Sequence, residues 1–319
     1  MKIYPWHKDN WDQLINNHDN LPHALIFHGP ADSGINSFAA EICKKLVCNA
    51  ITSGHTYCNE CHNCNWFDSQ AHPDILIINN NLSDEGKVNI IVDSIRELKE
   101  FFELTAHQKD GRKIALINDA HQLNKSAANA LLKILEEPPN DAIIILTTSE
   151  LGKILPTIRS RSRLIRFFKP NLDVANNYLS SIDKEELLSF ISLYGGNPIA
   201  LVNDLENKST LTEIITSLRR GGQFDLSSIN NGWLDKGLPW IINLIQKWSY
   251  EILLTKLTEC QYYFPSEKSN IETLAKKADL KTLLKFHKKL MAVKLYSSAP
   301  VNKEINLDLI FFDYREIFI

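Results

Sequence analysis

Four of the six cysteines in this 319-residue chain lie within a stretch of seventeen residues. Two residues separate Cys58 from Cys61 and Cys61 from Cys64, and Cys48 stands upstream. Such gaps let successive thiolates point into one tetrahedron around Zn²⁺. Clustered cysteines in a chain without an export signal favour a metal over disulfides. The spacing predicts a zinc site, and four sulfur ligands would make it structural rather than catalytic.

The alternative for these cysteines is a set of buried free thiols. The segment 49–62 is polar and offers little core, which argues against that alternative. His55 and His62 are weaker candidates to replace one sulfur ligand. We expect Cys48 to end the preceding helix and to reach the other three cysteines across a nine-residue loop.

A second chemical motif occupies residues 29–37, after an apolar run. Gly29 and Gly34 have the spacing of a phosphate-binding loop between a strand and a helix. Ile35 stands where a lysine would reach the β- and γ-phosphates, and Asn36 stands where a hydroxyl would hold Mg²⁺. Because isoleucine carries no charge, the loop predicts that this chain does not bind ATP productively.

The apolar run at 114–117 ends in a second altered motif. Asn118 and Asp119 stand where an ATPase of this type would place an aspartate that holds magnesium and a glutamate that orients water. The neutral amide of Asn118 is a poor Mg²⁺ ligand by comparison. Both motifs therefore predict a nucleotide site without its chemistry.

Short apolar runs that alternate with helix-like segments position these motifs in the first 170 residues. Buried strands separated by helices predict a parallel sheet that is covered on both faces. The clearest helix spans about 124–137, where Asn124 or Ser126 can cap it and Pro138 stops it. The expected strands are 24–28, 75–78, 114–117, 143–146 and 164–168.

After Pro170 the pattern predicts helices only. Lysines follow one face of the segment 280–296, and we interpret them as a solvated face rather than a DNA-binding patch. The expected helices are 172–181, 184–193, 197–205, 209–219, 238–257, 268–277, 280–296 and 304–317.

Composition restricts the class of protein. With 44% hydrophobic and 23% charged residues, the chain has the profile of a globular protein with two or three domains. A net charge of -3 argues against a free-standing nucleic-acid binder. No signal peptide is visible, and no apolar run approaches the roughly 20 residues that a membrane span needs. We expect a cytoplasmic protein with no membrane partner.

Several segments together resemble one family, the delta-prime subunits of the bacterial DNA polymerase III clamp loader. The run 126–139 ends in Leu-Glu-Glu-Pro-Pro and is specific to clamp-loader subunits, and the altered phosphate loop selects delta-prime among them. The similarity covers residues 1 to about 170 and weakens beyond. The matching segments are Tyr4-Pro5-Trp6, 21–24, the cysteine cluster, His72-Pro73-Asp74, Asp119-Ala120-His121, 126–139 and 157–163.

The resemblance implies an AAA+ fold and a place in a ring. The implied division is an α/β module at 1–168 with a zinc-binding insertion at 48–64, a helical lid at 169–206 and an all-α collar at 207–319. The implied partners are ATP-hydrolysing subunits of the gamma/tau type and a delta subunit in a pentameric ring. Such a ring loads the sliding clamp onto primer-template DNA, and it would bring the chain to the nucleoid through the replisome.

The resemblance also singles out Arg161 as an arginine finger. A guanidinium placed in trans against a neighbour's γ-phosphate stabilises charge in the transition state. Ser162 departs from the family's Ser-Arg-Cys, although serine is nearly isosteric with cysteine. Pro198 stands where active relatives carry an ATP-sensing arginine.

The preferred function is a non-hydrolysing clamp-loader subunit that acts in DNA replication. The first alternative is an active AAA+ ATPase with atypical motifs, which Ile35 and Asn118 disfavour. The second is a zinc-dependent DNA-binding protein outside any ring. The acidic balance disfavours it, as does the lack of aromatic residues interleaved with basic ones.

Overall fold

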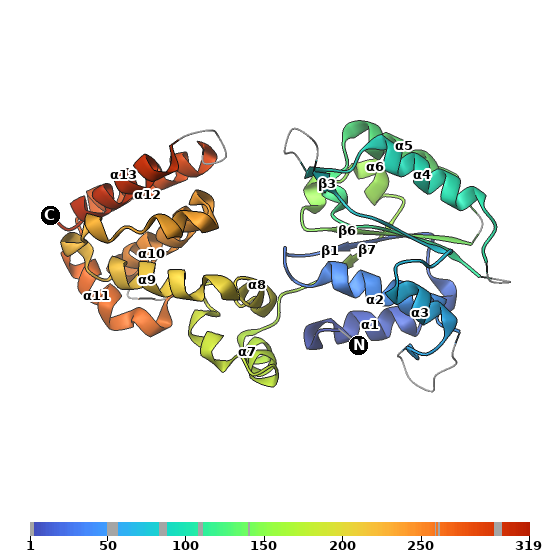
Figure 1. The fold of residues 1–319 in the computed structure, drawn as a ribbon, viewed down its shortest axis with the longest axis horizontal. Helices are drawn as coiled ribbons and strands as arrows, with labels where there is room; N and C mark the ends of the chain where they lie inside the picture. Colours follow the sequence, from blue (N-terminus) through green and yellow to red (C-terminus); the bar gives the residue numbers. More distant parts are fainter. Residues whose placement is uncertain are drawn as a thin grey trace. The chain divides into compact units, whose positions relative to one another are not determined.

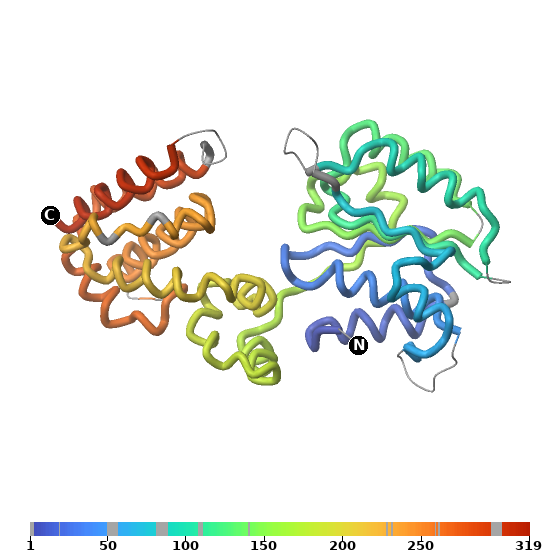
Figure 2. Tube along the Cα trace, viewed as in Figure 1, coloured from blue at the N-terminus to red at the C-terminus, as the bar shows by residue number. Residues whose placement is uncertain are grey.

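The computed structural model separates the chain into two compact units. They are Met1–Pro170 and Asn171–Ile319, and each is described here by itself (Figures 1 and 2). The structure describes residues 3–49, 57–82, 88–107, 111–139, 141–258, 260, 262–296 and 302–319.

The first unit is built on a parallel sheet of five strands in the order β2-β5-β6-β1-β7. Isoleucine and leucine dominate the central strands, because helices cover both faces and leave no polar side. The predicted strands are confirmed, with β6 longer than expected and β7 ending earlier. The strands are β1 (Ala24–His28), β2 (Ile75–Ile78), β5 (Lys113–Ile117), β6 (Ala142–Thr148) and β7 (Arg163–Arg166).

Two layers of helices sandwich this sheet (Figure 1). Successive side chains of a strand point to opposite faces, so Phe27 of β1 faces one core and Ile26 faces the other. Helices α1 (Lys8–Ile15), α2 (Ile35–Val47) and α3 (His62–Asp68) lie on the Phe27 side, and α4 (Val92–Glu103) and α5 (Lys125–Glu136) on the Ile26 side. The unit also contains the antiparallel strand pair β3 (Asn81–Leu82) and β4 (Val88–Asn89), and the short helix α6 (Pro156–Arg159).

The helix predicted at 124–137 is present as α5. Asn124 caps it, since its side-chain oxygen accepts a 2.8 Å hydrogen bond from the backbone N–H of Ala127. The buried residues Leu131 and Leu135 follow one stripe of the helix. The sequence allowed either Asn124 or Ser126 as the cap, and the structure shows that Asn124 is the cap.

The second unit contains helices only among its described residues. A small cluster around Leu179 and Leu201 is separate from a larger core around Trp248 and Phe311. The predicted segment 184–193 forms a 3₁₀ helix over Glu185–Phe190 instead of a long α-helix. The α-helices are α7 (Leu172–Ser181), α8 (Pro198–Asn203), α9 (Lys208–Leu218), α10 (Leu238–Thr258), α11 (Lys268–Lys277), α12 (Leu280–Tyr296) and α13 (Lys303–Glu316).

The division of this unit into a lid and a collar near residue 206 stays a prediction. Across the described parts of both units, none of the helices combines the length and the apolar character needed to cross a membrane.

Candidate functional site

Helix α2 connects two of the predicted sites. It begins directly after the phosphate loop, where Gly34 adopts φ 87° in the left-handed region. It ends at Cys48, whose extended backbone leaves the helix. The predicted position of Cys48 at a helix end is therefore observed. One helix thus holds the altered nucleotide loop at one end and the first cysteine at the other.

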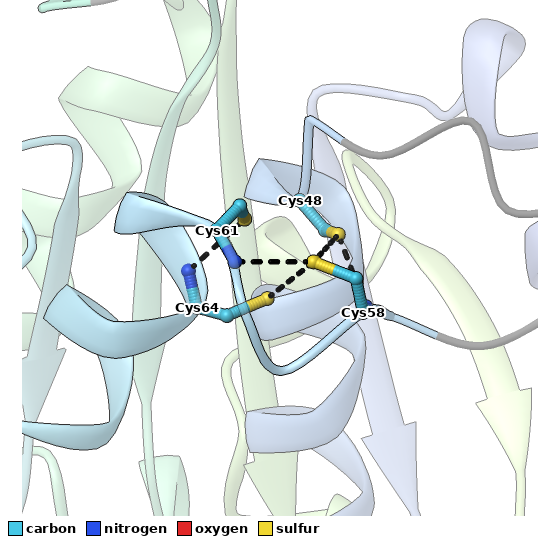
Figure 3. Close-up of side chains that lie close together, drawn as sticks. All are labelled: Cys48, Cys58, Cys61 and Cys64. Atoms are coloured by element: carbon cyan, nitrogen blue, oxygen red, sulfur yellow. Dashed lines mark hydrogen bonds between the residues drawn. The ribbon is translucent and has the colours of Figure 1, made fainter.

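The structure brings the four predicted cysteines together (Figure 3). Their sulfur atoms all lie within 4.8 Å of one another, with Cys48–Cys58 at 3.7 Å and Cys58–Cys64 at 3.9 Å. Four sulfurs at 2.3 Å from a tetrahedral Zn²⁺ would be about 3.8 Å apart. The site therefore has the size of a four-thiolate zinc shell. Among the described residues this group of ligands contains no histidine: His62 lies outside it, and His55 lies outside the described residues.

Backbone N–H groups point at the sulfur atoms. The N–H groups of Glu60 and Cys61 donate to Cys58 Sγ at 3.5 and 3.3 Å, and they lower the pKa of that thiol to about 6. Cys64 N donates to Cys61 Sγ at 3.5 Å. Burial raises the pKa of Cys64 to about 12, so a cation is what would hold its thiolate. Together the four cysteines could hold a metal ion.

Two side chains fasten this centre to α2. The ammonium of Lys44, whose side chain is 7% exposed, lies 2.7 Å from Asn59 Oδ1 and from Asp68 Oδ1. Asn63 is buried and donates 2.7 Å to the carbonyl of Val47 at the end of the helix. The turn that carries Cys58 and Cys61 is thus fixed against α2 from both sides.

At the other end of α2, Ile35 is buried rather than turned toward a phosphate. It is 6% exposed and belongs to the core that includes Phe38 and Phe167. A Cβ at Gly29 would lie 3.0 Å from Ile35 Cδ1 and 2.7 Å from the carbonyl oxygen of Phe167. The residue at the lysine position therefore packs beneath the loop, and the glycine is required by that close approach.

Aromatic side chains from the N-terminal segment close this core. His7 is 1% exposed and packs edge-on against Phe38 and Phe167, with ring centroids 5.5 and 4.9 Å away. Neither of its ring nitrogens has a hydrogen-bond partner. Burial lowers the pKa of His7 to about 4, which keeps the imidazole neutral. Trp6 donates to the backbone oxygen of Ser33 in the loop at 3.3 Å.

In the altered second motif, Asn118 forms hydrogen bonds with neutral side chains. Asn118 donates 2.9 Å to Asn79 Oδ1 and its own Oδ1 accepts from Thr147 at 3.4 Å. Asn36 lies 3.5 Å from Asp119 Oδ2, at the limit of a hydrogen bond. The structure thus places Asn36 of the loop beside Asp119 of the second motif.

Arg161 lies after α6, apart from these groups. Its Nη2 is 3.0 Å from Oε1 of Glu136, the last residue of α5. Its Nη1 donates 3.1 Å to the carbonyl oxygen of Thr157. Ser162 donates 2.9 Å to the carbonyl of Ile158, so serine fills the position of the family's cysteine with a backbone contact. Arg161 is thus at the surface, where another molecule can reach it.

Comparison with known proteins finds a similar solved structure and several similar sequences. A gamma subunit-related protein of Thermotoga maritima superposes with a TM-score of 0.46 at 18% identity, over 98% of this chain and 100% of that one. Residues 7–171 match the family described as DNA polymerase III, delta subunit. DNA polymerase III subunit delta' of Escherichia coli K12 is 29% identical over 77% of this chain and 75% of that protein. The same subunit of Pseudomonas aeruginosa is 30% identical over 265 residues, which are 80% of this chain and 79% of that protein. The chain belongs to the delta-prime family.

Membership of the delta-prime family confirms the predicted family and the role of a clamp-loader subunit in DNA replication. The α/β unit with its parallel sheet has the predicted AAA+-type fold, and the second unit is helical as expected. A delta-prime subunit works with other clamp-loader subunits. The parts played by Arg161 and the four cysteines stay predictions.

Four residues with clear contacts were missed by reasoning from the delta-prime sequence. Lys44 and its partner Asp68 are 24 positions apart, so no local spacing indicates the pair. Glu136 stands inside the Leu-Glu-Glu-Pro-Pro run, which was recognised as a family signature without a role for its acids. His7 follows the matching Tyr4-Pro5-Trp6 segment, and that proximity was its only signal.

Proposed function

We propose that this delta-prime chain is a non-hydrolysing member of the clamp-loader ring that completes a neighbour's ATP site with Arg161. Its enzyme partners are ATP-hydrolysing subunits of the gamma/tau type, and a delta subunit completes the pentamer. The complex acts on the sliding clamp and primer-template DNA. Replication takes place in the bacterial cytoplasm, so we expect the chain there, at the nucleoid.

The observation that carries this proposal is the burial of Ile35. An active loop needs a cationic side chain that points at the β- and γ-phosphates. Here the side chain at that position lies in the core against Phe167. Asn118 supplies a neutral amide where magnesium needs a carboxylate. These contacts favour a chain that neither holds Mg-ATP productively nor hydrolyses it.

A guanidinium is suited to act at a neighbouring site. It keeps its charge at every physiological pH and presents a planar fork of donors that matches phosphate oxygens. The side chain of Arg161 is 38% exposed and is held at the surface by its own unit. Arginine fingers in other nucleotide hydrolases contribute roughly 10³ to 10⁵ in rate.

The metal of this chain is proposed to be zinc with a structural role. Cys48, Cys58, Cys61 and Cys64 would hold it: their sulfur atoms all lie within 4.8 Å of one another, and the Cys48–Cys58 and Cys58–Cys64 distances of 3.7 and 3.9 Å match its tetrahedral shell. Bound zinc would cross-link the end of α2 to α3. With four thiolates no ligand position is left for substrate, so the metal takes no part in ATP chemistry.

The test is a reconstituted clamp loader that carries Arg161→Ala, assayed for ATP turnover and clamp loading with clamp and primed DNA. We expect turnover at one site to fall at least a hundredfold, and total turnover to fall by that site's share. Arg161→Lys should rescue poorly, because ammonium lacks the bidentate fork.

The matched controls are the neighbouring arginines. Arg159 is half-buried in the same segment, and Arg163 is exposed on β7. Their alanine variants should leave turnover at that site unchanged. If Arg159→Ala abolishes it while Arg161→Ala does not, the finger is the other arginine; if none of the three matters, the proposal is wrong.

A further inference from the structure

The guanidinium of Arg161 has a carboxylate partner in its own chain. Nη2 lies 3.0 Å from Glu136 Oε1, while Nη1 donates to the carbonyl of Thr157 and lies 3.5 Å from the hydroxyl of Ser160. The side chains of Arg161 and Glu136 are 38% and 44% exposed. The fork of donors that would bind a phosphate is therefore engaged by acceptors of the same unit.

Buried packing, rather than the charges, sets the position of this pair. Glu136 ends α5 directly after the buried Leu135, and Arg161 follows the buried Ile158 of α6. Helices α5 and α6 pack against each other. Because both backbones are anchored in the core, the two side chains stay within reach of each other whether or not they form an ion pair.

The stability of α5 gives no reason for an acid at position 136. The carbonyl groups at a helix C-terminus carry partial negative charge and disfavour a carboxylate there. Glu136 and Glu137 both stand at this end, and Arg161 lies against Glu136. A carboxylate presents two oxygens to a guanidinium in the same way as a phosphate does. Glu136 thus occupies Arg161 with a group that resembles the proposed ligand.

We propose that Glu136 is a positioning residue, which holds Arg161 until a phosphate of a neighbouring subunit's nucleotide replaces its carboxylate. The inference rests on the function proposed for Arg161. No covalent bond changes; one anion takes the place of another on the same guanidinium. An exposed ion pair is weak, so the exchange lowers the apparent affinity for ATP by only a few-fold.

Glu136→Gln tests this inference, because glutamine keeps the shape and removes the charge. In a reconstituted clamp loader with clamp and primed DNA, we expect the apparent KM for ATP at the site facing Arg161 to fall about two- to fivefold. The kcat should change by less than about twofold. Glu137→Gln is the matched control, since its exposed side chain is the next residue, and it should behave as the unmodified protein. Glu136→Asp keeps the carboxylate, so its apparent KM for ATP should stay close to that of the unmodified protein.

A measurement on the chain without nucleotide separates the inference from the proposed function. Phenylglyoxal, a reagent for guanidinium groups, should modify Arg161 faster in Glu136→Gln than in Glu137→Gln, as read by peptide mass mapping. The unfolding midpoint should be the same in both variants, which a purely structural role of Glu136 would not allow.

Adding Glu136→Gln to Arg161→Ala should cause no further change in KM, because the carboxylate acts through that guanidinium alone. The inference is overturned if Arg161→Ala impairs turnover while Glu136→Gln matches Glu137→Gln or raises the KM. If Arg161→Ala has no effect, the proposed function fails, and the faster modification then shows an ion pair without a role at the ATP site.

Discussion

The two ends of α2 differ in which part of a binding site is present, the backbone shape or the ligand groups. At its N-terminus the glycines and the turn of a phosphate loop remain, but Ile35 has joined the core. At its C-terminus all four sulfur ligands are present and converge within 4.8 Å. One end of the helix therefore has the backbone of a phosphate loop without the side chains that would bind phosphate. The other end has four sulfur atoms that lie close together and follow no such loop.

The difference shows that backbone shape and ligand chemistry are separable. A loop can keep its conformation for packing reasons, since Gly29 is needed where Phe167 approaches closely. Packing explains the cysteine cluster less well, because Cys64 is buried but Cys48, Cys58 and Cys61 are only partly buried. The phosphate loop is explained by its contacts, and the cysteine centre has the geometry of a group that could hold a metal ion.

Metal removal should have the largest effect of these tests. A small effect would contradict the contrast drawn between the two ends of α2. We expect about one Zn²⁺ per chain after purification without added metal. Chelation should cost the segment around α3 on the order of 10 kcal/mol of local folding free energy, the scale of structural zinc sites. Metal analysis and hydrogen exchange of residues 57–68 are the measurements.

Cys58→Ser provides the genetic version of that experiment. It should disorder the cysteine segment while the sheet stays folded, because the core of the first unit lies elsewhere. Cys43→Ser is the control: Cys43 is buried on α2 away from the centre and should leave zinc content unchanged. A protein free of metal whose four thiols all react under native conditions would contradict the zinc assignment.

Ile35→Lys asks whether the altered loop needs only its missing lysine. The ammonium would replace an apolar side chain in the core, so we expect a loss of about 2–5 kcal/mol of stability. Affinity for Mg-ATP should stay weak, since Asn36 and Asn118 still offer only neutral amides, which are poor magnesium ligands. Ile35→Val, at about 1 kcal/mol, is the control for packing. Micromolar binding by Ile35→Lys in a calorimetric titration would show that the loop had lost a single group.

Acid should weaken the N-terminal end of α2 through His7. Burial holds its folded pKa at about 4, below the unfolded value of 6.5, so folding excludes the proton. Stability from this group is fully present above pH 6.5 and is lost as the pH falls toward 4, by about 3 kcal/mol in total. Burial also lowers the pKa of His28 and His72, which add to the slope.

His7→Phe isolates that contribution. Phenylalanine suits the surrounding rings of Phe38 and Phe167 and cannot take up a proton. Urea unfolding of both proteins at pH 7 and pH 4.5 should show a smaller loss of stability for the variant. An equal loss would mean that His7 titrates normally.

The sequence was sufficient for what is local or repeated. Five apolar runs predicted five strands, and Asn124 with Pro138 bounded α5 to within one residue. The cysteine group followed from two-residue spacing. The departures at Ile35 and Asn118 could be recognised because a known motif fixes what should stand there. The alternative of a ring-independent DNA-binding protein is removed by family membership.

The rest depends on contacts between distant positions. That Ile35 lies beneath Gly29 requires β7 to bring Phe167 to the loop, which no spacing in the sequence shows. The pair of Glu136 and Arg161 joins the ends of two helices in the same way. The helix predicted over 184–193 is too long, because the apolar spacing of this segment also suits a 3₁₀ helix that packs on a small core.

Lys44→Met gives the smallest expected effect and sharpens the comparison from the cysteine end. Lys44 is one turn before Cys48 on α2 and contacts Asn59, which lies between Cys58 and Cys61, and Asp68, which follows Cys64. Methionine keeps the apolar stem but removes these contacts, so the turn that carries Cys58 should lose its preferred orientation. Groups that orient metal ligands typically contribute 10- to 100-fold in affinity. We expect zinc affinity to fall by about tenfold, because Asp68 is half-exposed and water can replace the ammonium. Competition with a chromophoric chelator measures this zinc affinity.

Asp68→Asn should have a smaller effect on zinc affinity, since an amide oxygen can still accept a hydrogen bond. Lys99→Met, an exposed lysine of α4, should have none. If Lys44→Met binds zinc as tightly as the unmodified chain, the cysteine segment organises itself without α2, and the two ends of the helix are independent.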